Sequence, residues 1–407
     1  MKKTSKLLSL LLALMLMFTA CGGGAGGSKK VQGVTDKEIL VGNTAAVSGA
    51  FATVGVPFNA GIEAYFKYIN ENGGVKGRTI KFVHTDDEFA PDKGKAQLQA
   101  MVEDKKVFAI VGHFGTPVVS ATIDDLKEYG VPAVYFATGI GQLYNEKAEG
   151  QDRNLFPVQP IYITEGEIMV ARGAGDYKAK KIGVIFTNDD AGKDMLKGAQ
   201  AKAKELGLEL VSEQVEPGAT DVSAAVTSLL SEKPDFIIGA AIQQTIPTII
   251  KALASQGNTA PVITTYVNVA PVIAQAVAEE SKKFDILGNG WVDFTQETAV
   301  KEFEHYKKYM PEKYHDNAYA ITGWIAGLFF TEGLKRIPEG TDITWESYMD
   351  ALEKEPILNP FGGEIDFTNG KRQGTTVMNL SKVNPDAPTG WEMTKPLQSM
   401  DSILKSK

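Results

Sequence analysis

Cysteine is almost absent from this chain of 407 residues, since only Cys21 is present. A single cysteine excludes an internal disulfide, and a chain of this length can bury enough core to fold without one. Cys21 directly follows three early lysines, an apolar run over 7–18 and two small residues. That order is typical of a secretory signal, because the apolar run is too short for a spanning helix.

The residues Phe18 to Cys21 resemble the lipobox of bacterial lipoproteins, whose cysteine carries a lipid anchor. On that resemblance we expect 1–20 to be a signal peptide and Cys21 to be lipidated. The stretch 21–33 contains GGGAGGSKK and is predicted to be a flexible tether. The protein is therefore expected to be exported and anchored to the outer face of the cell membrane.

Long apolar runs and basic clusters are missing beyond the tether. The most apolar later stretch, 318–334, is interrupted by glycines, threonines and Glu332, so it predicts a buried core helix and no membrane span. The formal net charge is −8 at pH 7. This balance argues against nucleic acid as a partner, because nucleic-acid binders concentrate positive charge.

Catalytic and cofactor motifs are missing as well. The chain has neither a Walker A lysine loop nor a GxGxxG that opens a helix, and its four histidines lack metal-ligand spacing. We expect no cofactor, no metal site and no enzyme activity. His113 is interpreted as a structural hydrogen-bonding group. The acid pairs at 86–87 and 189–190 are interpreted as solvated or helix-capping acids, because adjacent strand residues point to opposite faces.

The stretch 107–139 reads VFAIVGHFGTPVVSATIDDLKEYGVPAVYFATG and is the most informative part of the chain. A β-rich run, a glycine-bearing loop, a helical segment and a second β-rich run predict a βαβ unit of a parallel sheet. Thr116 before Pro117 is typical of a helix N-cap followed by the first helical residue. The free N–H groups of that helix start could hold a carboxylate, or Thr116 could serve only as a cap.

Strands and helices alternate through the rest of the chain. The pattern starts with a strand at 38–43 and a helix at about 57–70, and it restarts after an irregular segment at about 141–164. The stretch 235–266 repeats the order of 107–139, which indicates two similar lobes. We interpret three parts of the chain as segments that cross between the lobes. They are the irregular segment at about 141–164, the stretch 286–294 and the C-terminal tail. The expected fold class is α/β, with doubly wound parallel sheets.

Small residues, hydroxyls and aromatics gather at the predicted strand ends. Ser48, Thr116 and Thr138 offer hydroxyls that could bind a carboxylate. Phe51, Phe114, Tyr162 and Tyr266 could wall an apolar pocket, with core packing favoured for Phe114. These features suit non-covalent recognition of a small molecule.

Four segments together resemble one known family. They are the first strand with Ser48-Gly49, then AGIEAYFKYINENGGVKGRTIKFVHTDDEFAPDKG, IVGHFGTPVVSA and VPAVYFATG. The chain resembles the type I periplasmic solute-binding proteins of ABC importers, in particular the leucine/isoleucine/valine-binding branch. The resemblance implies two α/β lobes joined by three crossover strands. It predicts that 34–158 and 293–357 form the first lobe. The second lobe is predicted to consist of 159–292 and 358–400.

The resemblance also implies a site in the cleft between the lobes. Thr116 stands where the family has a Ser or Thr hydroxyl, and 137–139 where it has a second carboxylate contact. Tyr162 stands at the entrance to the second lobe. Tyr266 occupies the place of the acid that receives the ligand ammonium in amino-acid binders, and Val54 appears in place of an aromatic. The predicted ligand-binding residues are Ser48, Phe51, Thr116, Ala137, Thr138, Tyr162, Asp190, Gln243 and Tyr266.

The expected function follows from this resemblance. It is the binding component of an ABC importer that captures a branched-chain-like amino acid or a related small carboxylate and delivers it to a permease with its ATPase. Without an acid at 266, an aromatic or aliphatic carboxylic acid that is not an α-amino acid fits about as well, since a buried ammonium without a carboxylate is costly. A ligand-sensing receptor domain is the alternative from another class.

Overall fold

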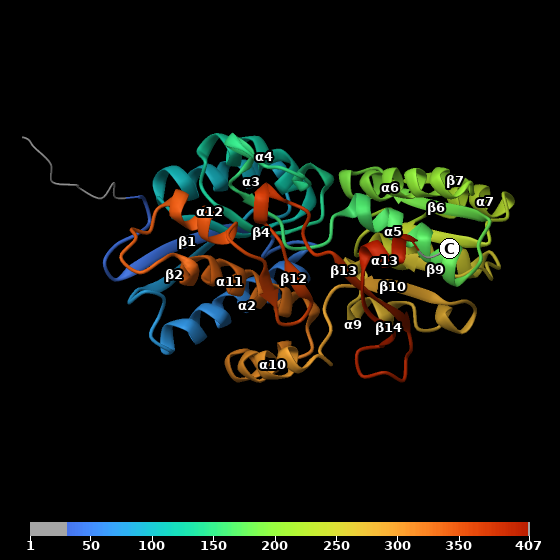
Figure 1. The fold of residues 1–407 in the computed structure, drawn as a ribbon. Helices are drawn as coiled ribbons and strands as arrows, with labels where there is room; N and C mark the ends of the chain where they lie inside the picture. The colour runs from blue at the N-terminus through green and yellow to red at the C-terminus, as the bar shows by residue number, and fades with distance from the viewer. Residues whose placement is uncertain (1–30, 406–407) are drawn as a thin grey trace, which may run out of the picture. The chain divides into compact units, whose positions relative to one another are not determined.

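The computed structural model describes residues 31–405. The predicted signal peptide, the lipidation site Cys21 and most of the tether lie outside the described residues. Within 31–405 the chain forms two lobes, each built on its own sheet with helices on both faces, as Figure 1 shows. The predicted α/β class with two doubly wound lobes is confirmed.

The first lobe contains a five-stranded sheet in the order β2-β1-β3-β4-β5, in which every neighbouring pair is parallel. Its strands are β1 (Glu38–Ala45), β2 (Thr79–Asp86), β3 (Ala109–Phe114), β4 (Ala133–Ala137) and β5 (Leu155–Phe156). The carboxyl ends of β3 and β4 therefore meet at one edge, where ligands bind in open α/β sheets.

The second lobe contains a seven-stranded sheet in the order β14-β13-β10-β9-β8-β6-β7. Its strands are β6 (Lys181–Thr187), β7 (Glu209–Val215), β8 (Phe236–Ala240), β9 (Val262–Thr264), β10 (Ile286–Gly290), β13 (Val377–Val383) and β14 (Trp391–Ser399). The five parallel strands follow the same spatial order as those of the first sheet. The internal repeat predicted from the sequence is thus present in the topology.

Three segments connect the lobes: one after β5, one after β10 and one after β12. Strands β11 (Ile357–Asn359) and β12 (Gly363–Ile365) pair with each other in a separate antiparallel hairpin, and β11 contacts helix α11. This hairpin begins at residue 357, the predicted limit of the first lobe. The predicted residue limits of the two lobes stay predictions.

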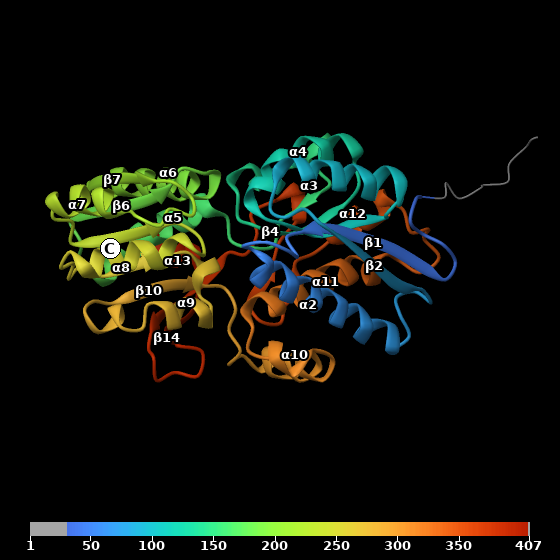
Figure 2. The ribbon, with the colours of Figure 1, turned by 180° about the vertical axis from the view of Figure 1, so that it is seen from behind.

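Helices cover both faces of each sheet. In the first lobe, α3 and α4 lie on one side of the sheet and α2 and α11 on the other, in both views of the molecule (Figures 1 and 2). The helices are α2 (Ala52–Glu71), α3 (Pro91–Gln99), α4 (Thr116–Tyr129), α5 (Tyr162–Asp176), α6 (Asp190–Leu206), α7 (Ser223–Ser231), α8 (Thr245–Ser255), α9 (Pro271–Ala276), α10 (Glu297–Tyr309), α11 (Ala318–Arg336), α12 (Trp345–Leu352) and α13 (Met400–Lys405).

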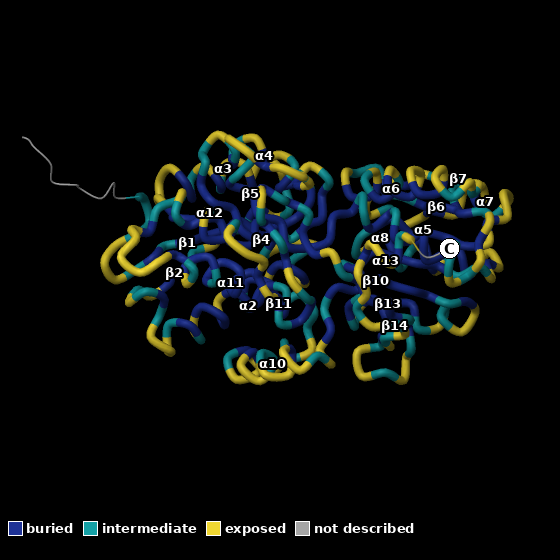
Figure 3. Tube along the Cα trace, in the orientation of Figure 1, coloured by how far each residue is buried: buried dark blue, intermediate teal, exposed yellow. Residues whose placement is uncertain are grey.

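The central strands are apolar on both faces, as the sequence pattern requires for strands covered twice. On β3, Val111 faces one hydrophobic cluster and its neighbour Ile110 faces another. On β8, Ile238 likewise belongs to one hydrophobic cluster and its neighbour Ile237 to another. Figure 3 shows the result, with buried strands inside each lobe and exposed residues on outer helices and loops.

Two predicted helix starts differ from the structure. Helix α2 begins at Ala52, five residues before the expected position, because small residues of the predicted loop already take helical geometry and Pro57 lies inside the helix. The N-cap of α4 is Gly115, at φ 90°, and Thr116 is the first helical residue. The prediction that Thr116 is the cap was wrong. Its hydroxyl is therefore free to bond elsewhere.

The acid pair at the start of α6 behaves as the capping interpretation predicts. Asp189 is the N-cap, and its Oδ1 accepts a 2.8 Å hydrogen bond from the N–H of Gly192, whereas Asp190 is exposed. We expect Asp189→Ala to lower the free energy of unfolding by about 1 kcal/mol, since the helix loses its cap. Asp190→Ala should change it by only a few tenths of that amount. Urea denaturation of both variants tests this pair, and equal losses would contradict the assignment.

Candidate functional site

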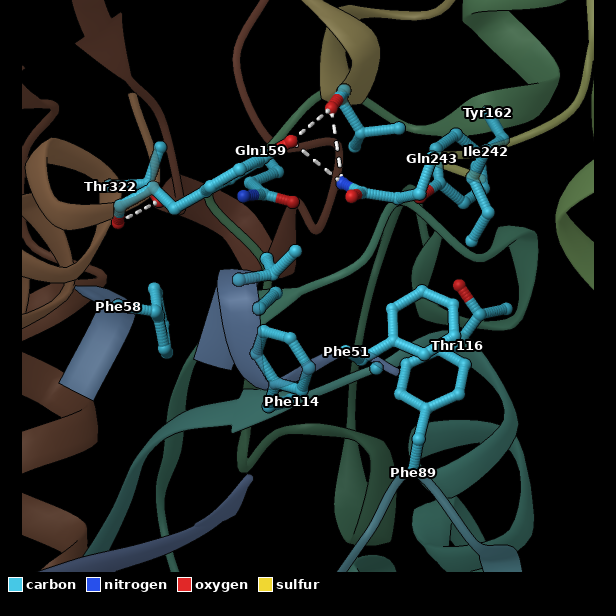
Figure 4. Close-up of a pocket in the computed structure, with 15 residues that line it drawn as sticks. Phe51, Phe58, Phe89, Phe114, Thr116, Gln159, Tyr162, Ile242, Gln243 and Thr322 are labelled. Atoms are coloured by element: carbon cyan, nitrogen blue, oxygen red, sulfur yellow. Dashed lines mark hydrogen bonds between the residues drawn. The ribbon is translucent and has the colours of Figure 1, made fainter. Parts of the chain in front are cut away.

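A pocket lies between the lobes at the carboxyl ends of β3 and β4. Its walls come from the first lobe, from the connecting segment after β5 with the start of α5, and from the segments that follow β8 and β9 (Figure 4). The lining residues are Phe51, Val54, Phe58, Phe89, Phe114, Gly115, Thr116, Ala137, Gln159, Tyr162, Ile242, Gln243, Val267, Tyr319 and Thr322. None of these side chains carries a formal charge. The cavity volume is about 60 Å³, which is small beside typical ligand pockets.

Phenylalanine rings form one wall of the pocket. The rings of Phe51 and Phe89 stack with their centroids 3.8 Å apart, and Phe114 meets Phe89 edge-on at 6.2 Å, as Figure 4 shows. Phe89 adopts a φ of 64°, and Asp87 Oδ1 accepts a hydrogen bond from its N–H. A Cβ at Gly115 would lie 2.5 Å from the Phe89 ring, so this wall requires glycine there.

Hydroxyl groups form a polar part of the pocket, beside the phenylalanine rings (Figure 4). Thr116 Oγ1 and Thr138 Oγ1 are 2.8 Å apart, and Thr138 Oγ1 also accepts a hydrogen bond from the N–H of Ile140. Burial raises the pKa of the nearby Tyr162 to about 12, so its hydroxyl remains protonated. The first turn of α4 adds N–H groups that lack partners within the helix. Together these groups offer donors to an anion without a cationic side chain.

Glutamines link the two lobes across the pocket. Gln243 Nε2 donates to Tyr319 Oη at 3.0 Å, and thereby ties the loop after β8 to α11. Gln159 in the connecting segment donates to Tyr135 Oη at 2.7 Å and accepts from Tyr266 Oη at 3.1 Å. These bonds hold the lobes close together, so a change in lobe separation would have to break them.

A buried carboxylate lies behind the pocket. Glu165 accepts hydrogen bonds from the N–H of Tyr266 at 2.8 Å and from Thr265 Oγ1 at 2.6 Å, and its side chain has no exposed surface. Burial raises the pKa of Glu165 to about 7. Glu165 is hydrogen-bonded to the loop that carries Tyr266 and does not line the pocket.

The other titratable groups bear on the predicted role of His113 and on metal binding within the described residues. His113 Nε2 lies 2.7 Å from Thr122 Oγ1, and burial lowers the pKa of His113 to about 4. Its predicted structural role agrees with this geometry. Within 31–405 no three metal-binding side chains come together. Over the same residues no helix has the length and apolar character of a membrane span.

The family of the chain follows from a comparison with protein-family models. Residues 38–388 match the model of the periplasmic binding protein family. The chain belongs to this family. The resemblance to type I binding proteins that the sequence indicated is thereby confirmed, over most of the chain.

Several relatives of this periplasmic binding protein are known. Leu/Ile/Val-binding protein homolog 7 of Brucella abortus is 25% identical over 388 residues, covering 88% of this chain and 94% of the relative. An amino acid binding protein of Pseudomonas aeruginosa is 25% identical over 224 residues, which span 55% of this chain and 59% of that relative's length.

Solved structures share the fold of this periplasmic binding protein. A fatty acid ABC transporter substrate-binding protein from Thermomonospora curvata superposes with a TM-score of 0.80 at 23% identity, over 94% of this chain and 98% of that one. A branched chain amino acid ABC transporter protein from Thermus thermophilus with bound valine gives 0.78 at 17% identity, over 91% and 99%. At these identities the likeness establishes the fold.

The structure brings together five of the nine predicted site residues. The residues that line the pocket are Phe51, Thr116, Ala137, Tyr162 and Gln243. Thr138 lies directly behind Thr116, and Tyr266 lines a second, larger cavity. Ser48 is exposed beside Asp86, and Asp190 begins α6; neither lines a cavity described here. The role of all nine in ligand binding stays a prediction.

Sequence reasoning missed several lining residues. Phe89 and Gln159 are the most prominent, since one stacks on Phe51 and the other bridges the lobes. Gln159 had a readable signal, because it lies between two prolines in the connecting segment. Phe89 had none, since its position depends on a left-handed turn that the sequence pattern does not reveal.

Proposed function

We propose that this protein is the substrate-binding component of an ABC importer and that it binds the carboxylate of a small solute at Thr116. The solute would be an amino acid or a related acid, handed on to a membrane permease and its ATPase. The proposal includes no catalysis. The observation that carries it is the convergence of hydroxyl groups and a helix start on an uncharged, aromatic-walled pocket between two lobes.

The pocket chemistry favours a carboxylate held by dipoles. Thr116 Oγ1 can donate a hydrogen bond to an anion while it accepts one from Thr138 Oγ1. The N–H groups in the first turn of α4 also favour a negatively charged group at the start of the helix. A ligand that contacts both lobes stabilises the closed arrangement relative to an open one. The Gln243–Tyr319 hydrogen bond gives such a closed arrangement a direct link between the lobes.

The absence of an acid among the residues lining this pocket supports a second candidate ligand. An α-amino acid would bring an ammonium group close to its carboxylate, and no carboxylate side chain lines the pocket to receive it. An aliphatic or aromatic carboxylic acid needs no such partner. The fatty acid binding protein among the structural neighbours agrees with this candidate.

We further propose that the protein lies outside the cytoplasm, attached to the membrane surface, on the basis of the predicted signal peptide and lipidation at Cys21. The family is one of periplasmic binding proteins, which agrees with an extracytoplasmic location. Metabolic labelling with a fatty acid, compared between the native chain and Cys21→Ser, would test the anchor. An unlabelled native chain would contradict it.

We expect Thr116→Val to weaken binding of a carboxylate ligand about tenfold or more, because one charge-assisted hydrogen bond is lost. Calorimetric titration should use a panel of branched-chain amino acids and aromatic and aliphatic carboxylic acids. Thr220→Val is the matched control, since it removes an exposed hydroxyl that lies outside both cavity linings. If no acid binds the native protein, or if valine at 116 leaves affinity unchanged, the proposal fails.

A further inference from the structure

A second cavity, of about 390 Å³, adjoins the Thr116 pocket. The two share four lining residues, namely Gln159, Val267, Tyr319 and Thr322. Pockets that bind drug-sized ligands typically have volumes of about 300–1,000 Å³, so the second cavity reaches that range and the first does not. Most of the space available to a ligand therefore lies in the second cavity.

Several large aromatic side chains line the second cavity. Trp291 and Phe294 come from the segment after β10, Phe303 from α10 and Trp391 from β14. Its lining contains no lysine or arginine, and the Nε2 of its histidine, His315, lies 3.1 Å from the carbonyl oxygen of Met310. The acids Asp293 and Asp316 supply its formal charges, so the cavity disfavours an anionic group and favours a cationic one.

Asp293 is the decisive residue of this cavity. Its side chain is only 5% exposed, and Oδ1 accepts hydrogen bonds from the N–H and Oγ1 of Thr295 at 2.8 and 2.6 Å. In the described part of the chain no lysine, arginine or histidine pairs with it, and Oδ2 receives no hydrogen bond from the protein. Buried carboxylates are normally paired with a cation. An unpaired one in a cavity wall indicates a cationic ligand.

We propose that the second cavity binds the ammonium group of an apolar ligand and that Asp293 receives it. The aromatic rings surround the apolar part of the ligand, and their faces attract its positive charge. Thr116 and Asp293 line different cavities, separated by Gln159 and Thr322. If, on the proposed function, one ligand fills both cavities, an apolar spacer separates its carboxylate from its ammonium, as in an ω-amino acid.

The test uses three probes of equal chain length: hexylamine, hexanoic acid and ω-aminohexanoic acid. Calorimetry and tryptophan fluorescence report binding, because Trp291 and Trp391 line the second cavity. The variant is Asp293→Asn, whose side-chain oxygen can still accept from Thr295. The matched control is Asp342→Asn, an exposed acid that lies outside both linings.

We expect Asp293→Asn to weaken hexylamine binding at least tenfold and to leave hexanoic acid binding unchanged, while Asp342→Asn changes neither. The ω-amino acid should bind more tightly than either single-ended probe. Failure of the native protein to bind hexylamine, or equal binding by Asp293→Asn, would overturn the inference. Hexanoic acid reports on the proposed function separately, since its binding depends on Thr116.

Discussion

Gly323→Ala is expected to lower the free energy of unfolding by about 2–3 kcal/mol, because helices α2 and α11 cross with their backbones in contact. A Cβ at Gly323 would lie 1.9 Å from the carbonyl oxygen of Phe58, and one at Gly61 would lie 2.0 Å from that of Ala320. Backbone atoms cannot rotate away as a side chain can, so the helices must separate. The gain in helix propensity of about 1 kcal/mol offsets only part of the loss.

Thermal and urea denaturation would measure this loss, which corresponds to a decrease in Tm of roughly 3–4 °C for a chain of this size. Gly94→Ala is the matched control, since the atoms nearest to a Cβ there belong to the side chain of Val118 and not to backbone. The control should lose less stability, because a side chain can shift. Gly323→Ala at or above native stability would show that the two helices do not cross this closely. Phe58 and Thr322 line the Thr116 pocket, so ligand affinity should fall with stability.

Glu165→Gln is expected to stabilise the protein by about 3 kcal/mol above pH 7. Burial raises the pKa of Glu165 from about 4.5 to about 7, and one pKa unit corresponds to about 1.4 kcal/mol. The folded state therefore retains a proton that the unfolded chain releases. This difference in proton binding contributes to the free energy of unfolding. The contribution is complete below pH 4.5 and is lost as the pH rises through about 7. Glutamine has nearly the same shape and does not titrate, so the variant avoids that loss.

Denaturation from pH 4.5 to 8.5 should be compared between the native protein and Glu165→Gln. His113 acts in the opposite direction, since its pKa is lowered to about 4 and its stabilising effect grows as the pH rises toward 6.5. The difference between the two proteins removes the contribution of His113. Glu339→Gln, at an exposed position, should follow the native curve. A constant difference across this range would contradict the buried, titrating Glu165.

The architecture of the two lobes could be predicted from the sequence because each lobe repeats one local pattern. Apolar runs such as 236–240 are buried on both faces, and the helices that follow them are amphipathic, so a doubly wound parallel sheet is the arrangement that covers both. The start of α2 was less readable. Ala52 and Thr53 are helical although their sequence is loop-like. The preceding residue, Phe51, stacks on Phe89, 38 positions away in the chain, and such a long-range contact is not visible in a local pattern.

The site was predicted in part for the same reason. Thr116, Ala137 and Tyr162 follow strands or begin helices, and strand ends in a parallel sheet meet at one edge. Asp293 escaped prediction, because its importance comes from burial among aromatic residues of separate elements with no cation nearby.

The sequence by itself determined the α/β class, the repeated lobes and the family, because strand and helix periodicity and the family's segments are local properties of the chain. Tertiary structure alone decided how closely α2 and α11 approach, which hydroxyls reach the pocket and where an unpaired carboxylate lies. Those features depend on distances between residues far apart in the chain, such as Gly61 and Ala320, and on the burial that sets the pKa of Glu165. Packing and desolvation act through space, so no local pattern of residues encodes them.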